Sequence, residues 1–253
     1  MLNFKITGEG EVLVLIHGFC ENLTLWSDLQ KKLVGYTILS LDLPGFGGSE
    51  IIPKISINKM ANEINLLLEK LDISKCTLIG HSLGGYVALD FAEHYPEKLN
   101  GVGLFHSTAF ADSEEKKENR NKTFDFIEKH GVQNFANSFV GTLFYPGKRH
   151  KFEQKIDQLS DIVKNTTKET VLQTTIAMRD RDCKIHVLEQ LNVPVLFIVG
   201  KEDQAVPMNK ALEQCFIPKD SVVHFFENTG HMGMFEKEEE TTKAIKNFMA
   251  YVH

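Results

Sequence analysis

The sequence lacks an excess of basic charge, a long hydrophobic run and a recognisable leader. Its 253 residues carry a formal net charge of −6, whereas most nucleic-acid-binding domains have a basic face. This balance also favours neutral or weakly polar substrates over polyanions. The longest apolar runs, residues 12–16 and 193–199, are strand-sized and too short to span a bilayer. No basic region followed by a long apolar stretch begins the chain, so we expect no signal peptide.

Cysteine is scarce, and its spacing shows no pairing. The four cysteines, Cys20, Cys76, Cys183 and Cys215, form no C-x-x-C pair. Disulfide frameworks and structural zinc sites depend on closely spaced pairs. The spacing is therefore typical of a reduced, cytoplasmic chain with free thiols.

Two cofactor motifs are absent as well. The H-E-x-x-H stretch of a catalytic metal site does not occur. The stretch from Gly141 to Lys148 is similar to a phosphate-binding loop, but five residues separate its glycines instead of four, and Arg149 follows the lysine. We therefore expect no metal and no cofactor. The negative net charge, in turn, leads us to expect no nucleic-acid partner.

Strand and helix patterns alternate near both ends of the chain. We expect strands at residues 2–7, 12–16, 36–41, 76–79, 99–105, 193–199 and 222–226. We expect helices at residues 24–34 and 56–71, from the turn after residue 79 to Tyr95, and at 185–191, 208–215 and 235–251, with Ser56 as an N-cap. This alternation predicts an α/β fold with a mostly parallel central sheet and helices on both faces.

The alternation stops between residues 107 and 183. Only helical patterns remain there, at residues 113–130, 132–140, 152–163 and 167–178. We interpret residues 107–183 as a helical cap, or lid, inserted into a core domain that consists of residues 1–106 and 184–253.

The central motif is Gly80-His81-Ser82-Leu83-Gly84-Gly85, which lies between an apolar strand and an amphipathic helix. This order is the signature of a nucleophile elbow. The turn is so tight that side chains at residues 80 and 84 would collide with the backbone, which explains the glycines. The hydroxyl of Ser82 would project from the sheet edge, beside the free N–H groups of the new helix.

A serine hydroxyl needs a base, and the base needs an orienting group. In a parallel sheet both should follow the carboxyl ends of later strands. His231 comes directly after the strand at residues 222–226, and Asp203 after the strand at 193–199, with Glu202 as the rival acid. His106, just after the strand at residues 99–105, could face the site or pack in the core.

The chain order Ser82, Asp203, His231 is that of α/β-hydrolases. With these residues the chain resembles the α/β-hydrolase superfamily, in particular its lid-bearing, serine esterase-like branch of carboxylesterases, lactonases and C–C hydrolases. The resemblance extends from about Val12 to the end, except the cap. Its motifs are His17-Gly18-Phe19, the Asp42–Ser49 loop, Gly80–Gly85, Gly200-Lys201-Glu202-Asp203 and Gly230-His231.

The resemblance also implies an oxyanion hole. In this family one donor is the backbone N–H after the nucleophile, here Leu83, and the other comes from the loop after the early strand, here Phe19. His17 would brace that loop, and the loop from Asp42 to Ser49 would be structural. A serine at the elbow argues against haloalkane dehalogenase and epoxide hydrolase activity, because those relatives carry aspartate there.

We therefore expect a cofactor-free serine hydrolase that cleaves a small carboxylic ester, thioester or lactone through an acyl-enzyme on Ser82. Seven residues could line an apolar acyl pocket, although residues of these types more often belong to the packed core: Phe110, Phe135, Phe139, Phe144, Met178, Val206 and Met232.

Two alternatives stay open. A C–C bond hydrolase or a cofactor-free peroxidase would use the same triad. A non-catalytic ligand-binding protein on this fold is the alternative from another class. The natural substrate depends on how the cap packs, and the sequence determines neither this packing nor the oligomeric state.

Overall fold

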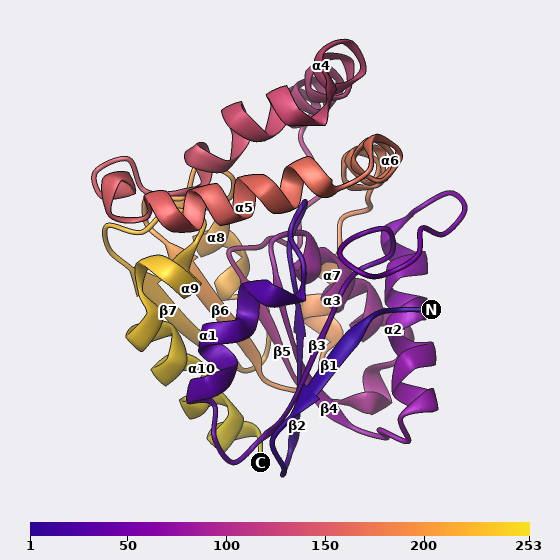
Figure 1. The fold of residues 1–253 in the computed structure, drawn as a ribbon. Coiled ribbons are helices and arrows are strands. Elements are labelled where there is room, and N and C mark those ends of the chain that lie inside the picture. The colour runs from indigo at the N-terminus through magenta and orange to yellow at the C-terminus, as the bar shows by residue number, and fades with distance from the viewer.

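The computed structural model describes all residues, 1–253, and shows a seven-stranded sheet of order β1-β3-β2-β4-β5-β6-β7 (Figure 1). Only β1 is antiparallel to its neighbour, so the expected mostly parallel sheet is confirmed. The strands are β1 (Phe4–Thr7), β2 (Val12–Ile16), β3 (Thr37–Leu41), β4 (Cys76–His81), β5 (Leu99–Phe105), β6 (Val195–Gly200) and β7 (Ser221–Phe226). The carboxyl ends of β2 to β7 therefore meet at one edge of the sheet.

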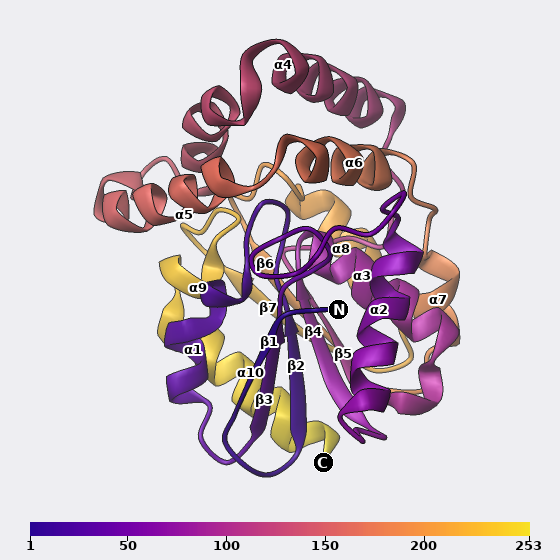
Figure 2. The same ribbon diagram turned by 45° about the vertical axis from the view of Figure 1, so that its right-hand side comes forward.

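Helices cover both faces of this sheet, which explains why strands such as β2 and β6 are apolar throughout. One face carries α1 (Ser27–Lys32) and α10 (Glu238–Val252), which contact each other. The other carries α2 (Ile57–Lys70), α3 (Leu83–His94) and α7 (Ile185–Gln190), as Figure 2 shows. The helix α8 (Met208–Cys215) packs against β6, and the short α9 (Gly233–Glu236) follows β7.

The helix α2 illustrates how the sequence builds this layer. The Ser56 side chain accepts a hydrogen bond from the N–H of Lys59, so the expected N-cap is confirmed. Met60, Ile64 and Leu68 follow at helical spacing and are fully buried against the sheet and α3.

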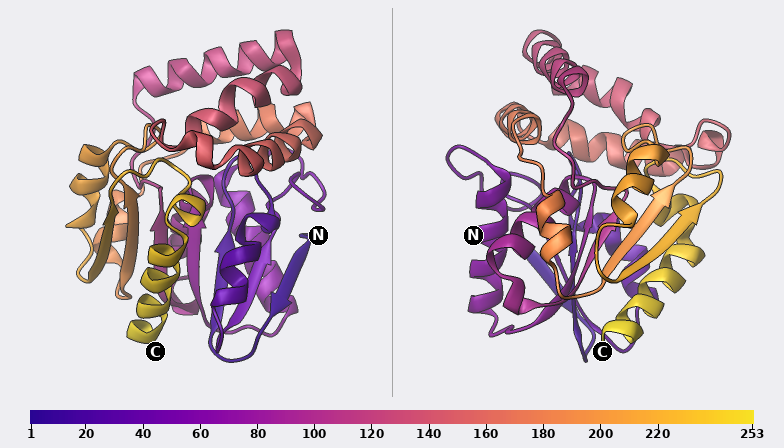
Figure 3. Two further views of the ribbon diagram at one scale, coloured as in Figure 1. Left: turned by 60° about the vertical axis from the view of Figure 1, so that its left-hand side comes forward. Right: turned by 180° about the vertical axis from the view of Figure 1, so that it is seen from behind.

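Between β5 and α7 the chain forms the helices α4 (Glu114–Phe139), α5 (Glu153–Asn165) and α6 (Lys168–Arg179). We call this part the α4–α6 segment; it lies over the carboxyl edge of the sheet (Figures 1 and 3). Gly131 interrupts α4 with a φ of 79° and a ψ of 167°, at the boundary between the two helical patterns expected there. Buried residues of the segment, such as Ile127 and Leu159, join one continuous apolar core with the sheet domain.

Two expected helices are each divided. Residues 23–26 form a 3-10 helix ahead of α1, where Asn22 caps the N–H of Thr24. Near the end, Lys237 has a non-helical ψ of 53° and separates α9 from α10. The Glu236 side chain accepts N–H groups of Tyr145 and Gly230 there, so tertiary contacts determine where α9 ends. None of the helices combines the length and the apolar composition needed to cross a membrane.

Candidate active site

Ser82 occupies a sharp corner between β4 and α3. Its φ of 51° and ψ of −114° lie in a region that non-glycine residues rarely adopt. A side chain on Gly80 would overlap the backbone of Gly84, and one on Gly84 would overlap the carbonyl oxygen of Ile16. The hydroxyl of Ser107 donates to the Ser82 carbonyl at 2.7 Å. The expected strand–turn–helix corner is therefore present, and packing on three sides holds its backbone.

His231 and Asp203 meet at the same edge of the sheet. The Nδ1 atom of His231 lies 2.7 Å from Oδ2 of Asp203, and both side chains are buried. The other oxygen, Oδ1, accepts the N–H groups of Ala205 and Val206. Glu202 instead accepts the N–H of Thr229. Of the two acids that the sequence offered, Asp203 is the one against the histidine.

A second histidine contacts the same carboxylate. Nδ1 of His106 lies 3.2 Å from Oδ2 of Asp203, and Nε2 accepts the N–H of Gly233 at 3.2 Å. Burial lowers the pKa of His106 to about 4, against the opposing effect of Asp203, so its imidazole is neutral at pH 7. The backbone N–H of Gly200 also approaches Nδ1, at 3.2 Å, so this ring contacts Asp203, Gly200 and Gly233.

Burial alone would raise the pKa of the Asp203 carboxyl. The charge of His231 and the hydrogen bonds from His106 and His231 outweigh this effect and hold the pKa well below its ordinary value. Asp203 is therefore a carboxylate throughout the neutral range. An ionised acid in this position keeps the proton of His231 on Nδ1 and leaves Nε2 free to accept another.

The loop after β2 supplies Phe19, whose backbone N–H donates to no group of the protein. Leu83 is the first residue of α3, where helical N–H groups have no partner within the helix. His17 braces this loop, because Nδ1 donates to the Gly18 carbonyl at 2.7 Å and Nε2 accepts the N–H of Leu43 at 2.9 Å. One of these N–H groups directly follows Ser82 in the chain, and the other comes from the loop after the neighbouring strand β2.

The seven expected pocket residues separate into groups. From α4, Phe135 and Phe139 pack on the ring of Phe19, with centroids 6.2 and 6.0 Å away. Phe144 instead stacks between the rings of Phe152 and Phe235, which is core packing. Of the remaining four, Phe110 and Val206 line a hollow near Lys210, and Met178 and Met232 are buried in the continuous core.

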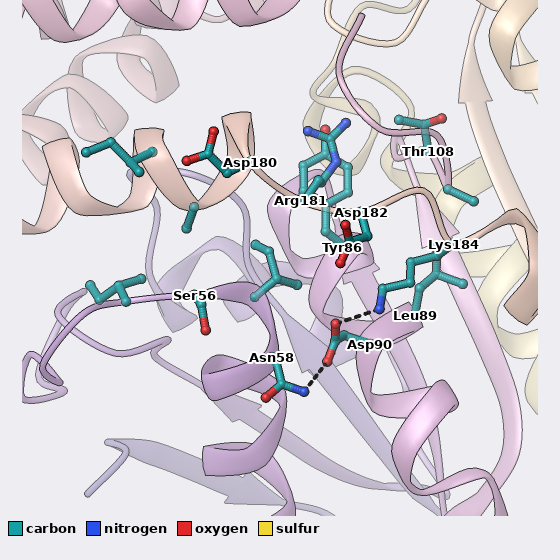
Figure 4. Close-up of a pocket in the computed structure, with 15 residues that line it drawn as sticks. Ser56, Asn58, Tyr86, Leu89, Asp90, Thr108, Asp180, Arg181, Asp182 and Lys184 are labelled. Atoms are coloured by element: carbon teal, nitrogen blue, oxygen red, sulfur yellow. Dashed lines mark hydrogen bonds and ion pairs between the residues drawn. The ribbon is translucent and has the colours of Figure 1, made fainter.

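A cavity of about 280 Å³ lies between α2, α3 and the connection from α6 to α7 (Figure 4). Sequence reasoning missed it, because its walls come from segments far apart in the chain. Both basic side chains of its lining are paired: Lys184 lies 3.0 Å from Asp90, and Arg181 stacks on Tyr86 and pairs with Asp112. Ser82, Asp203 and His231 do not line it.

Donor atoms of His106, Asp203 and His231 all lie within 4.8 Å of one another, a spacing that a metal ion could use. The same atoms hold the hydrogen bonds described above. A metal ion there would have to break the contact between His231 and Asp203, so this cluster is better suited to proton transfer than to metal binding.

The strand order of the sheet and the strained serine at the carboxyl end of β4 are together typical of one class of α/β enzymes. The sequence model of the alpha/beta hydrolase fold family matches residues 11–238, and the chain belongs to this family. The resemblance seen in the sequence motifs is thereby confirmed.

Similar proteins include hydrolases of several kinds. An esterase from Thermogutta terrifontis, solved with malate bound, is 29% identical with a TM-score of 0.94 and covers 100% of this chain and 94% of its own. A 2-hydroxy-6-oxononadienedioate/2-hydroxy-6-oxononatrienedioate hydrolase from a Pseudomonas species is 25% identical over 268 residues, which cover 96% of this chain and 89% of the relative. An enol-lactonase from Burkholderia xenovorans LB400 is 21% identical, with a TM-score of 0.88 and coverage of 98% and 96%, and supports the fold alone.

Proposed function

We propose that the protein is a serine hydrolase that cleaves a small carboxylic ester, thioester or lactone through an acyl-enzyme on Ser82. The observation that carries this proposal is the 2.7 Å contact between Nδ1 of His231 and Oδ2 of the charged, buried Asp203. This contact lies at the same edge of the sheet as the strained backbone of Ser82. Nucleophile, base and orienting acid are the three groups that acyl transfer requires.

In this mechanism the Ser82 Oγ attacks the substrate carbonyl carbon while Nε2 of His231 takes the hydroxyl proton. Asp203 holds the Nδ1 proton and stabilises the imidazolium that forms. The N–H groups of Phe19 and Leu83 stabilise the oxyanion. The leaving group departs with the proton from His231, and water then releases the acyl group by the same steps.

The α4–α6 segment is the proposed cap, since it lies over this edge of the sheet and its rings of Phe135 and Phe139 pack on Phe19. An apolar wall beside an oxyanion donor suits a small acyl group of low polarity. The similarity to an esterase at 29% identity supports the same substrate class.

A C–C bond hydrolase is the second candidate. Two relatives, at 25% and 22% identity, are named as hydrolases of 2-hydroxy-6-oxo dienoic acids, and these match almost the whole chain. Such substrates are acidic. A direct comparison of neutral p-nitrophenyl esters with a 2-hydroxy-6-oxo dienoate therefore separates the two candidates.

The proposal predicts that Ser82→Ala abolishes hydrolysis of p-nitrophenyl esters. We expect kcat/KM to fall by about 10⁴-fold or more, because the triad acts as a unit. The assay uses acyl chains of increasing length, together with labelling by a fluorophosphonate probe. Ser160→Ala, at a buried serine of α5, is the matched control and should retain activity and labelling. Activity of Ser82→Ala within a few-fold of the parent would exclude this mechanism.

A further inference from the structure

A buried pair beside the proposed site has no part in the mechanism described so far. Oε2 of Glu21 lies 2.9 Å from Nδ1 of His81, and both side chains are almost completely buried. His81 is the residue before Ser82 in the elbow, and Glu21 belongs to the loop after β2. The pair therefore joins the loop of one proposed oxyanion donor to the nucleophile corner.

Each partner also makes one further contact at the site. Oε2 of Glu21 accepts the backbone N–H of Gly18 at 2.6 Å, one residue before Phe19. Nε2 of His81 lies 2.9 Å from the backbone carbonyl oxygen of His231. The contacts form a continuous chain from the oxyanion loop, through the residue before the nucleophile, to the backbone of the base.

The hydrogen-bond pattern determines the protonation of His81. A carbonyl oxygen only accepts, so Nε2 must carry a proton. Oε2 of Glu21 already accepts an N–H from Gly18, so it is best matched by a second N–H on Nδ1. Burial would lower the pKa of His81 and raise that of Glu21, but their mutual attraction reverses both directions. The pair is then an imidazolium and a carboxylate.

We propose that Glu21 and His81 are positioning residues that hold the Phe19 loop and the His231 loop in register with Ser82. This inference rests on the proposed function. It names two residues that never touch the substrate and act only through the groups that do.

The surroundings of the pair support this role. A Cβ atom on Gly18 would lie 2.7 Å from Oε2 of Glu21 and 2.8 Å from Nδ1 of His81, so the loop is packed directly against the pair. Cys20, between Phe19 and Glu21, has a φ of 59°, which is strained for a non-glycine residue. A strained loop keeps its conformation only where other contacts hold it, and Glu21 supplies such a contact.

The backbone of His231 is held from two sides. Its carbonyl accepts from His81, and its N–H donates to the carbonyl of Leu143 at 2.7 Å, in the α4–α6 segment. The contact between Nδ1 and Asp203 orients the imidazole ring of His231. The two backbone contacts instead fix the position of the loop that carries His231. Loss of the His81 contact would remove the hydrogen bond that links the backbone of His231 directly to the residue before the nucleophile.

The test is Glu21→Gln, which keeps the shape and removes the charge. We expect kcat for a p-nitrophenyl ester to fall about 10- to 100-fold, since small displacements of reacting groups have effects of this size, while KM stays within about threefold. The double variant with His81→Asn should lose no more than the worse single variant, because the two residues act as one unit. Asp90→Asn, at an equally buried carboxylate paired with Lys184, is the control and should keep the parental kcat.

Histidine ¹⁵N NMR gives a second readout that needs no activity. We expect His81 to carry protons on both nitrogens in the parent at pH 7 and on one nitrogen in Glu21→Gln. A neutral His81 in the parent would overturn the inference. So would a folded Glu21→Gln with parental kcat, or an equal loss in Asp90→Asn. If the parent protein hydrolyses no ester, the proposed function is wrong. The NMR measurement then still tests whether His81 is an imidazolium paired with Glu21.

Discussion

Four groups approach the carboxylate of Asp203 at the candidate site. Imidazoles of His231 and His106 approach Oδ2, and two backbone N–H groups donate to Oδ1. Each of these interactions favours the ionised form, which explains why the pKa of this buried carboxyl is lowered although burial acts to raise it. The side chain of Asp203 is therefore both buried and negatively charged.

The role proposed for Asp203 predicts a large effect of Asp203→Asn. The amide cannot keep the proton of His231 on Nδ1, so we expect kcat to fall by about 10⁴-fold, as in other triads. Glu202→Gln is the control, because Glu202 accepts only the N–H of Thr229. Steady-state kinetics on a p-nitrophenyl ester provide the measurement. Equal losses in the two variants would contradict the assignment.

At the scale of elements, one glycine determines where the helix α4 turns. The break in α4 depends on Gly131, whose positive φ costs little in glycine and strains any other residue. The break redirects the second half of the helix, which carries Phe135 and Phe139 toward Phe19. A local backbone property therefore places the apolar wall of the proposed pocket.

Gly131→Ala should destabilise the protein by about 1–3 kcal/mol, because a φ of 79° with a ψ of 167° is a conformation that is essentially confined to glycine. Space is not the cause, because a Cβ there meets only the side chain of Gln133 at 3.5 Å. Gly141 has no positive φ, and a Cβ there would meet only Arg149 at 4.0 Å. Gly141→Ala should therefore change the free energy of unfolding by about 0.5 kcal/mol at most. Urea unfolding measures both, and an unchanged Gly131→Ala midpoint would refute the strain argument.

For the whole molecule, the buried histidines connect stability to pH. Burial lowers the pKa of His17 and takes that of His106 to about 4, whereas Glu21 raises the pKa of His81 despite burial. All three would titrate near pH 6.5 in the unfolded chain. As pH falls below 6.5, His17 and His106 stay neutral in the folded protein, whereas the same histidines take up protons in the unfolded chain.

The free energy of unfolding should therefore decrease between about pH 6.5 and pH 4, because the unfolded state binds more protons there. His81 has the opposite sign: its contribution is complete below pH 6.5 and is lost as pH rises through its raised folded-state value. Below pH 6.5 the contribution of His81 is constant, so it does not offset the decline that His17 and His106 produce. Urea midpoints at pH 7, 6, 5 and 4 check this, and His106→Phe should show a shallower decline. A midpoint that is flat or rises toward pH 4 would contradict it.

The sequence by itself determined the parts of this protein that local patterns encode. Gly80 and Gly84 around Ser82 specify the elbow, Ser56 specifies the start of α2, and the loss of strand patterns after residue 107 specifies the helical segment. These features depend on backbone sterics, capping and periodicity within a few residues. They were therefore predictable without knowledge of the fold.

Only the tertiary structure decided which distant groups meet. Glu21 and His81 are 60 positions apart, and although His81 lies within the Gly80–Gly85 motif, no sequence pattern linked the two residues. The contact between His106 and Asp203 depends on β5 and β6 being neighbours in the sheet, and the sequence left His106 undecided between site and core. At the Ser82 corner, local sterics shape the serine, whereas the packing of three separate loops at one sheet edge determines the charges and hydrogen bonds around it.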